Sequence, residues 1–475
     1  QSQHISEINM GCGVSVDVYV SSNDNTNSTG VGGCFLGCCA CGKLRHHTIP
    51  LIKPPGENKK MLVQSPFMFH DIDEHARLAP EEVTHSIKAL VAYLIQPCHS
   101  DLDKVRSFYV WIANHISYDK NYAYGRKETS NDPMTVLRHR VANASEGYAN
   151  LLSAMCRSAN VPVKKLKGFA KGEDYDPEHP FSGEEDPEHA WNAVYVNNDW
   201  RFVDTAWGSG YTDDIGQFHK KYEEFWFLTD PENFINDHFP YLKNDPRTTE
   251  MWQLLKKPIS LEQYNRTVKT ETATKDWGVE LSHKEPIIVF RKEIHILVHT
   301  TIIPLVAITA TLDTSDKINM DAYVAVFKDR EDQFKVLVRP PSPGVYILKV
   351  YGKREGDTTN ANPGLVKYIL KCTDMNNLVK NFPISYTAAQ TYQCCLLEPT
   401  HRDLEADSKV RFRVTSPYLL EIMVEDTLLE KVDDFTWEGD YITPRRVGTQ
   451  LGLYGNTSEN SDFRKHQILY KFNIV

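Results

Sequence analysis

The sequence predicts an α+β domain followed by two all-β domains, and three observations lead to this fold class. The 475 residues are enough for three or so domains at roughly 100 to 200 residues each. Helical periodicity of apolar residues dominates the chain between about residues 80 and 158. Short segments of alternating apolar and polar residues dominate it after residue 277. Helices followed by strands within one domain are typical of the α+β class.

Residues 1–64 predict an irregular leader. They are rich in glycine, serine, asparagine and cysteine, and they end near the turn sequence Pro54-Pro55-Gly56. Half of the ten cysteines lie in this segment, at Cys12, Cys34, Cys38, Cys39 and Cys41. Their spacing lacks the paired C-x2-C knuckles of a zinc site, although His46 and His47 follow, so a metal site is the weaker interpretation.

The leader also contains a candidate lipidation signal. Met10-Gly11-Cys12-Gly13-Val14-Ser15 matches the myristoylation pattern at Gly11, and Cys12 is available for palmitate. The signal requires Met10 to start the chain, and here nine residues precede it. The alternative interpretation is a flexible tail with incidental cysteines. No charged n-region with a long apolar core is present, so we expect no signal peptide.

The first folded domain is predicted over residues 65–260. Residues 80–96 form one apolar stripe at helical spacing, and a second stripe begins at Asp101. A third helix is predicted over residues 145–158, with one face formed by Tyr148, Leu151, Leu152, Met155 and Cys156. The period then changes to two in residues 189–196 and 200–205, which flank Asn197-Asn198 and predict a β-hairpin.

Two β-sandwich domains are predicted for the rest of the chain, over residues 275–375 and 380–475. Each block contains several short alternating segments separated by turn residues, which is typical of sandwiches. Each block also ends in an apolar strand, Lys367-Tyr368-Ile369-Leu370 and Gln467-Ile468-Leu469-Tyr470. We interpret the two blocks as a weak tandem repeat.

Charge and hydropathy exclude two classes of function. The 63 acidic residues outnumber the 53 basic ones, so no positive field attracts nucleic-acid phosphates. The most apolar region, residues 287–308, is interrupted by Arg291, Lys292 and Glu293, so we expect no membrane span. The five cysteines after residue 64 are widely spread, which favours a reduced, cytoplasmic protein over a secreted disulfide scaffold.

The predicted hairpin places a histidine near an aspartate. If Asn197 and Asn198 form the turn, residue 189 lies opposite residue 206 and residue 204 opposite residue 191. His189 and Asp204 then share one face of the sheet, roughly 7 Å apart along the diagonal. An imidazole with an orienting carboxylate is what the base of a catalytic triad requires.

These segments resemble the transglutaminase-like core. In that family a cysteine begins a helix reading C-x-G-Y-A, a histidine follows in H-A-W-N, and an aspartate in W-x-x-x-D. This chain has Ser145-Glu146-Gly147-Tyr148-Ala149, His189-Ala190-Trp191-Asn192 and Trp200-Arg201-Phe202-Val203-Asp204. The resemblance implies a papain-like cysteine-protease type of core and assigns the base to His189 and the orienting role to Asp204.

A narrower resemblance points to the kyphoscoliosis peptidase and hillarin group. It rests on the segments KVRSFYVWIANHISYD at 104–119, KGFAK at 167–171, VDTAWGSG at 203–210 and WQLL at 252–255. The similarity is strong over residues 65–260 and weaker over the two sandwiches, which the resemblance implies are immunoglobulin-like.

One departure from the family pattern decides the functional prediction. Ser145 occupies the position of the family cysteine, and a hydroxyl is far less acidic than a thiol, whose pKa is about 8.5. Three explanations remain open: a natural pseudoenzyme, an engineered cysteine-to-serine change, and a working Ser-His-Asp hydrolase. Cys156 cannot replace the nucleophile, because eleven helical residues separate it from Ser145 by about 16 Å.

Simpler interpretations exist for each candidate residue. Ser145 is an ordinary helix N-cap type, Asp204 could cap a turn, and His189 could be a structural histidine. Trp191 and Trp200 are most simply core aromatics. The acidic, proline-containing segment 173–188, here called the acidic loop, is a solvated loop, a flap over the cleft or a loose calcium site.

We therefore expect a catalytically inactive, protein-binding or cytoskeleton-associated chain in the cytoplasm. It would need no cofactor, with calcium as the alternative, and its partner would be a protein rather than a nucleic acid. Attachment to a membrane surface through the leader is a further alternative. The competing function is acyl transfer at peptide or glutamine side chains, in the manner of a transglutaminase or cysteine peptidase.

Overall fold

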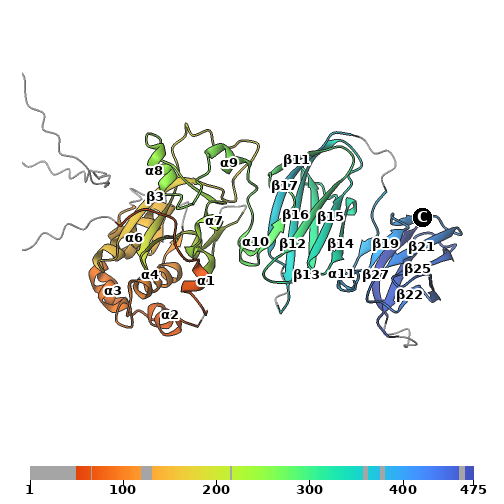
Figure 1. The fold of residues 1–475 in the computed structure, drawn as a ribbon, viewed down its shortest axis with the longest axis horizontal. Coiled ribbons are helices and arrows are strands. Elements are labelled where there is room, and N and C mark those ends of the chain that lie inside the picture. Colours follow the sequence, from red (N-terminus) through yellow and green to blue (C-terminus); the bar gives the residue numbers. More distant parts are fainter. Residues whose placement is uncertain are drawn as a thin grey trace, which may run out of the picture. The chain divides into compact units, whose positions relative to one another are not determined.

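The computed structural model describes residues 50–65, 67–118, 131–213, 217–356, 362–374, 380–458 and 466–475. Figure 1 shows the chain, with its helical part in red to yellow and its strand-rich C-terminal part in cyan to blue. The lipidation prediction for Gly11 and Cys12 and the N-terminal cysteine cluster lie outside the described residues. Within the described part, no helix combines the length and the apolar character needed to cross a membrane.

The first domain begins with helices. They are α1 (Lys59–Leu62), α2 (His70–Arg77), α3 (Ile87–Leu94), α4 (Asp101–His115), α5 (Pro133–His139) and α6 (Ser145–Ser158). Helix α4 starts with a capping box, in which Ser100 and Asp103 each bind the other residue's backbone N–H. Its apolar stripe is fully buried, as the sequence predicts.

The helix predicted over residues 80–96 is interrupted in the structure. Residues Glu81–His85 form a 3₁₀ helix, η1, and α3 starts only at Ile87. Ser86 is extended between them, with φ −151° and ψ 151°, and its hydroxyl accepts a hydrogen bond from the Ala89 N–H at 3.1 Å. The serine side chain thus satisfies a free N–H at a new helix start, which the apolar periodicity alone does not reveal.

A five-stranded antiparallel sheet completes the core of this domain. Its order is β8 (Phe227–Thr229), β5 (Asp199–Val203), β4 (His189–Val196), β3 (Val163–Ala170) and β9 (His238–Pro240). In the β4–β5 hairpin Val196 pairs with Asp199. Asn197 and Asn198 form the turn with φ 49° and 64°, as a type I′ turn requires. The predicted register is therefore confirmed.

Helix α6 packs against β3 and β4, and its first residue, Ser145, binds Ala190 near the start of β4. Asn192 of β4 fixes this contact, because its Nδ2 donates to the Ala149 carbonyl at 3.1 Å and to the Ser153 hydroxyl at 2.8 Å. Trp191 and Trp200 are 1% and 2% exposed, which confirms them as core aromatics.

Short elements fill the rest of the domain: β1 (Ser117–Tyr118), β2 (Val141–Ala142), η3 (Trp207–Ser209), β6 (Gly210–Thr212), β7 (Phe218–Lys220), η4 (Glu224–Trp226), α7 (Pro231–Phe234), α8 (Pro246–Met251) and α9 (Leu261–Arg266).

The end of the predicted leader differs from the structure, in which residues 50–64 lie on the first domain. The Asp199 carboxylate accepts the Gly56 N–H at 2.8 Å, and the Pro50 carbonyl accepts the Trp200 indole N–H at 3.2 Å. Lys59 of α1 donates to the Glu224 carbonyl at 2.7 Å. The turn sequence at residues 54–56 marks irregular backbone, but that backbone satisfies side chains of β5 and is part of the domain.

Two β-sandwiches follow, as the sequence predicts. The first joins the sheet β10 (Val279–Leu281), β12 (Ile294–Thr300), β15 (Gln333–Val338), β14 (Val324–Arg330) to the sheet β11 (Ile287–Phe290), β17 (Gly364–Cys372), β16 (Gly344–Arg354), β13 (Leu305–Thr314). Apolar residues from both sheets form one core. The helix α10 (Thr272–Asp276) and a preceding segment connect it to the first domain.

The second sandwich has its own core. One sheet runs β18 (Ile384–Ser385), β27 (Gln467–Ile474), β26 (Gln450–Asn456), β22 (Glu421–Val424), β23 (Thr427–Leu428), with β20 (Asp403–Leu404) also on β27. The other runs β19 (Cys395–Glu398), β21 (Lys409–Thr415), β25 (Thr436–Ile442), β24 (Glu430–Lys431). The short helix α11 (Thr387–Thr391) precedes β19.

Candidate active site

The structure brings the three predicted site residues together. Ser145 is the first residue of α6, His189 is the first residue of β4, and Asp204 follows the last residue of β5. The Ser145 hydroxyl accepts a hydrogen bond from the Ala190 N–H at 3.0 Å, next to His189 in the chain. The packing of α6 on β4 therefore sets Ser145 against the β4 backbone one residue after His189, and the hairpin register sets Asp204 beside the His189 imidazole from the other strand.

His189 and Asp204 form a direct hydrogen bond. The distance between His189 Nε2 and Asp204 Oδ2 is 2.7 Å, and their side chains are 13% and 0% exposed. The diagonal position on the hairpin, at a backbone separation of roughly 7 Å, leaves room for the imidazole to reach the carboxylate. Because Nε2 is occupied by Asp204, Nδ1 is the ring nitrogen left to act as a base.

The Asp204 carboxylate receives four donors. Oδ1 accepts the N–H groups of Ala206 and Trp207 at 2.8 and 3.0 Å, and Oδ2 accepts His189 and a second histidine, His238, at 2.7 and 3.0 Å. Burial alone would raise the pKa of Asp204, but the charge of His189 and hydrogen bonds from both imidazoles hold that pKa well below its ordinary value. The group is therefore an ionised and fully buried carboxylate.

Sequence reasoning missed His238, which lies on β9 and is fully buried. Burial lowers the pKa of its imidazole to about 4, against the opposing effect of the hydrogen bond to Asp204. A neutral ring that bonds a carboxylate through Nε2 must carry its proton there, so His238 is a donor. Strand β9 has three residues, and Ala170 of β3, its partner, lies 68 positions earlier. No local pattern marks such a residue.

Aromatic rings surround both imidazoles. The ring centroid of Trp207 lies 5.1 Å from that of His189 and 4.4 Å from that of His238. Phe234 stacks on His238 at 4.1 Å, and Trp226 contacts it edge-on at 5.2 Å. These rings bury His238 completely and leave His189 13% exposed. The low local dielectric strengthens the hydrogen bonds between the imidazoles and the carboxylate.

The surroundings of Ser145 differ from the simple N-cap interpretation. Ala144 occupies the N-cap position, and no side chain caps the helix. Among the described residues, no hydrogen bond joins the Ser145 hydroxyl to His189, and the Ala190 N–H is its partner. Glu146, the next residue, is paired with Lys165 and Lys167 at 2.6 and 3.0 Å, which offsets its negative charge at the helix start.

Cys156 is confirmed as a buried apolar residue. It lies near the far end of α6 and is 0% exposed, and burial raises the pKa of its thiol. A protonated, buried thiol is inert as a nucleophile. The five described cysteines, Cys98, Cys156, Cys372, Cys394 and Cys395, form no disulfide.

Two groups of residues offer atoms that a metal could use. The donor atoms of His189, Asp204 and His238 lie within 4.8 Å of one another. Both Nε2 protons already bind Asp204, so the hydrogen bonds account for this cluster. In the acidic loop Glu173 and Glu178 pair with lysines, at 3.1 and 2.7 Å. The calcium site suggested for this loop stays a prediction.

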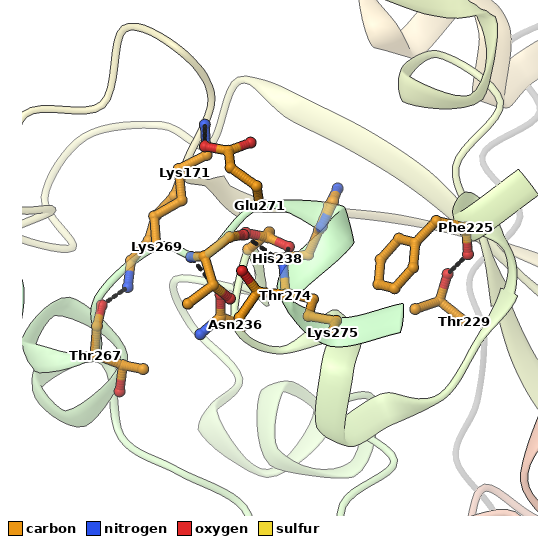
Figure 2. A network of polar contacts seen from close by, with 12 residues as sticks. Lys171, Phe225, Thr229, Asn236, His238, Thr267, Lys269, Glu271, Thr274 and Lys275 are labelled. Atoms are coloured by element: carbon orange, nitrogen blue, oxygen red, sulfur yellow. Dashed lines mark hydrogen bonds and ion pairs between the residues drawn. The ribbon is translucent and has the colours of Figure 1, made fainter. Parts of the chain in front are cut away.

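A polar network joins the site to the connection before the first sandwich (Figure 2). Asn236 accepts both the N–H and the hydroxyl of Thr270 through Oδ1, at 3.1 and 3.0 Å. The buried Lys171 donates to the Thr267 carbonyl at 2.6 Å. Lys275 of α10 forms a buried ion pair with Asp237, which precedes His238. Strand β9 is therefore held from the side of the sandwich.

Comparison with known proteins places these residues in a family context. Residues 88–205, which include Ser145, His189 and Asp204, match the family model "Transglutaminase-like superfamily". Residues 261–383 match the model "KY-like, immunoglobulin-like domain".

Three curated relatives are similar to the chain. "Kyphoscoliosis peptidase" of Homo sapiens is 35% identical over 60% of this chain and 40% of its own length. The Mus musculus protein of the same name is 33% identical over 64% and 43%. "Hillarin" of Drosophila melanogaster is 30% identical over 45% and 26%. The chain thus spans less than half of the length of these relatives.

Proposed function

We propose, for a chain that belongs to the transglutaminase-like proteins of the kyphoscoliosis peptidase and hillarin type, a role as a catalytically inactive protein-binding scaffold. One observation carries this proposal. Ser145 stands at the nucleophile position of the family motif, at the start of a helix that packs beside His189. The hydroxyl there binds a backbone N–H of β4 and contributes to the packing of the two elements.

The chemistry of the site explains why a serine would be inactive there. A thiol of pKa about 8.5 can exist as a thiolate beside an imidazolium, and the helix start favours that charge. A hydroxyl is far too weak an acid for this ion pair, so it needs a base that takes its proton during attack. Such a base must be within hydrogen-bond reach of the hydroxyl. The described contacts of Ser145 and His189 include no bond between them.

The alternative function is acyl transfer at peptide bonds or glutamine side chains. The intact pair of His189 and Asp204 favours it, because a buried, ionised carboxylate that orients an imidazole is costly to keep in a pure scaffold. In that mechanism Ser145 would attack the acyl carbonyl and His189 Nδ1 would take its proton. The same nitrogen would return the proton to the leaving amine.

Activity assays on two variants separate the two functions. We expect no amine incorporation into a glutamine-containing protein, and no peptide cleavage, by the unmodified chain. Ser145→Cys should create a measurable activity, because it supplies a group that His189 can deprotonate. Ser145→Cys combined with His189→Ala should lose that activity. Clear turnover by the unmodified chain that disappears in His189→Ala would contradict the scaffold proposal.

The partner of the scaffold is proposed to be a cytoskeletal protein in the cytoplasm. This part rests on the resemblance to the hillarin group. We propose that the partner binds the sandwiches, the first of which matches an immunoglobulin-like family model. Co-sedimentation of the chain with filamentous actin, compared with microtubules, checks it. The proposal of a cytoskeletal partner is wrong if the chain stays in the supernatant with both filaments.

A further inference from the structure

We infer that His238 is a positioning residue, whose imidazole holds the Asp204 carboxylate in the orientation in which Oδ2 receives His189. The inference deepens the proposed function, since it concerns the imidazole and carboxylate of the same site. It does not require the site to turn over a substrate. It predicts a role for a residue that lies outside every motif of the sequence.

The orientation of the Asp204 carboxylate is determined by its hydrogen-bond donors. The side chain is 0% exposed, so water cannot satisfy it. Its Oδ1 is bound by two N–H groups of its own loop, at Ala206 and Trp207. Oδ2 has two partners, His189 and His238, and of these only His238 is fully buried. Without His238 the orientation of Oδ2 would depend on the partly exposed imidazole that it is meant to orient.

The His238 ring is fully buried and enclosed by other aromatic rings. Phe234 stacks on its ring at 4.1 Å, and Trp207 and Trp226 pack around it. Its backbone pairs with Ala170 of β3. Among the described residues Nδ1 has no hydrogen-bond partner, so the bond from Nε2 to Asp204 is the one polar contact of the side chain. Because the ring is buried and has this single polar contact, its Nε2 proton is directed at Asp204 Oδ2.

Titratable groups face the Asp204 carboxylate from several elements. His189 faces Asp204 from β4 and His238 from β9, while the hydroxyls of Tyr109 on α4 and Tyr148 on α6 lie within electrostatic range. Burial raises the pKa of both tyrosines, so they are neutral at physiological pH. The two imidazoles are then the groups that stabilise the negative charge of the carboxylate at Oδ2. His238 does so as a neutral hydrogen-bond donor.

Two variants separate hydrogen-bond donation from packing. His238→Phe keeps an aromatic ring in the aromatic cage and removes the donor. His238→Gln keeps a neutral N–H donor in a side chain of similar reach and removes the ring. The measurement is the ¹³C carboxyl signal of Asp204 in the full chain between pH 3 and pH 8, assigned by comparison with Asp204→Asn. This measurement does not depend on enzyme activity. It can therefore be interpreted whether or not the scaffold proposal holds.

We expect the Asp204 signal of the unmodified chain to stay at its ionised position over this whole range. In His238→Phe the carboxyl should begin to titrate within it, a shift of about one pH unit or more, because one of two Oδ2 donors is lost. In His238→Gln the signal should stay at the ionised position. A flat titration in His238→Phe would overturn the inference. Equal shifts in both variants would also overturn it, since they would show that packing rather than donation matters.

A second readout uses the thiol that Ser145→Cys introduces. Its alkylation by iodoacetamide at pH 6 to 7, read by mass spectrometry at position 145, depends on an oriented His189. Adding His238→Phe should slow this alkylation on the order of tenfold, while adding His238→Gln should leave it within about threefold. An unchanged rate with His238→Phe would contradict the positioning role.

Discussion

At the scale of single residues, the site is defined by which atoms of Asp204 are occupied. Each oxygen accepts two hydrogen bonds, and the four donors belong to four different residues. His189 and Asp204 are predictable as neighbours from the sequence, because their spacing across a two-residue turn fixes their diagonal position. Ser145 is by residue type an ordinary helix cap, and here the structure differs, since the hydroxyl binds β4 instead.

The neutral state of His238 gives the first domain a specific pH dependence. The folded imidazole has a pKa of about 4, against about 6.5 for an unfolded histidine. Between these values the unfolded chain binds the additional proton, so stability must rise with pH in this window and fall as pH decreases through it. Lowering the pH from 7.5 to 5 should therefore reduce the free energy of unfolding by about 2 kcal/mol through His238 alone.

Urea unfolding at these two pH values tests this prediction. Tryptophan fluorescence reports mainly the first domain, which contains Trp111, Trp191, Trp200, Trp207, Trp226 and Trp252. The unmodified chain should lose about 2 kcal/mol more than His238→Phe between pH 7.5 and pH 5. An equal loss in the two proteins would show that the imidazole of His238 is protonated in the fold.

At the scale of elements, the β4–β5 hairpin is the part that the sequence specifies most completely. Residues 189–196 and 200–205 alternate, and the two asparagines between them tolerate positive φ better than most residues. Register follows from the turn, because the two-residue loop pairs Val196 with Asp199 and so sets every later pair of the hairpin. The hairpin in turn determines the geometry of His189 and Asp204.

A pair of turn substitutions tests this dependence. Asn198, at φ 64°, should accept glycine with a change in stability of at most about 1 kcal/mol. Asn198→Val should lower the free energy of unfolding by about 1 to 2 kcal/mol, because a β-branched residue is strained in the left-handed region. Urea unfolding of both variants measures the difference. Equal stabilities of the two variants would mean that the left-handed turn conformation at residue 198 does not determine the hairpin.

Other elements were beyond local prediction. The stripe at residues 80–96 is continuous in sequence, yet a serine hydroxyl starts a new helix within it. Strand β9 is too short to show a period, and its pairing with β3 joins residues 68 to 72 positions apart, from Ala170↔His238 to Gly168↔Pro240. Residues 50–64 have the composition of an irregular segment, and most of their backbone is irregular. Their contacts with Asp199 and Trp200 nevertheless make them part of the first domain.

At the scale of the whole molecule, the connection before the first sandwich is built into the first domain. Thr274 and Glu271 donate to the Leu365 carbonyl of β17, at 2.6 and 2.9 Å. From the same segment Lys275 reaches back to Asp237, beside His238. The strand that carries His238 thus shares its polar contacts with residues that bind the sandwich.

Breaking this ion pair should destabilise the first domain. The side chains of Lys275 and Asp237 are 6% and 2% exposed, so Lys275→Met leaves a buried carboxylate without its partner. We expect a loss of about 3 to 5 kcal/mol in the free energy of unfolding, and a smaller loss when Asp237→Asn is added. Arg266→Met, which removes an exposed pair with Glu262, is the control and should cost at most about 1 kcal/mol. Similar effects of Lys275→Met and Arg266→Met would contradict this account.

The sequence by itself determined the class of each domain, the hairpin register and the proximity of His189 to Asp204, because all of these depend on local period, turn chemistry and motif spacing. Only the tertiary structure decided what the Ser145 hydroxyl binds, that residues 50–64 belong to the first domain, and that His238 shares the carboxylate of Asp204. Those contacts join residues 34 to 143 positions apart. They are selected by burial, which requires every polar group that leaves water to find a partner wherever the packing provides one.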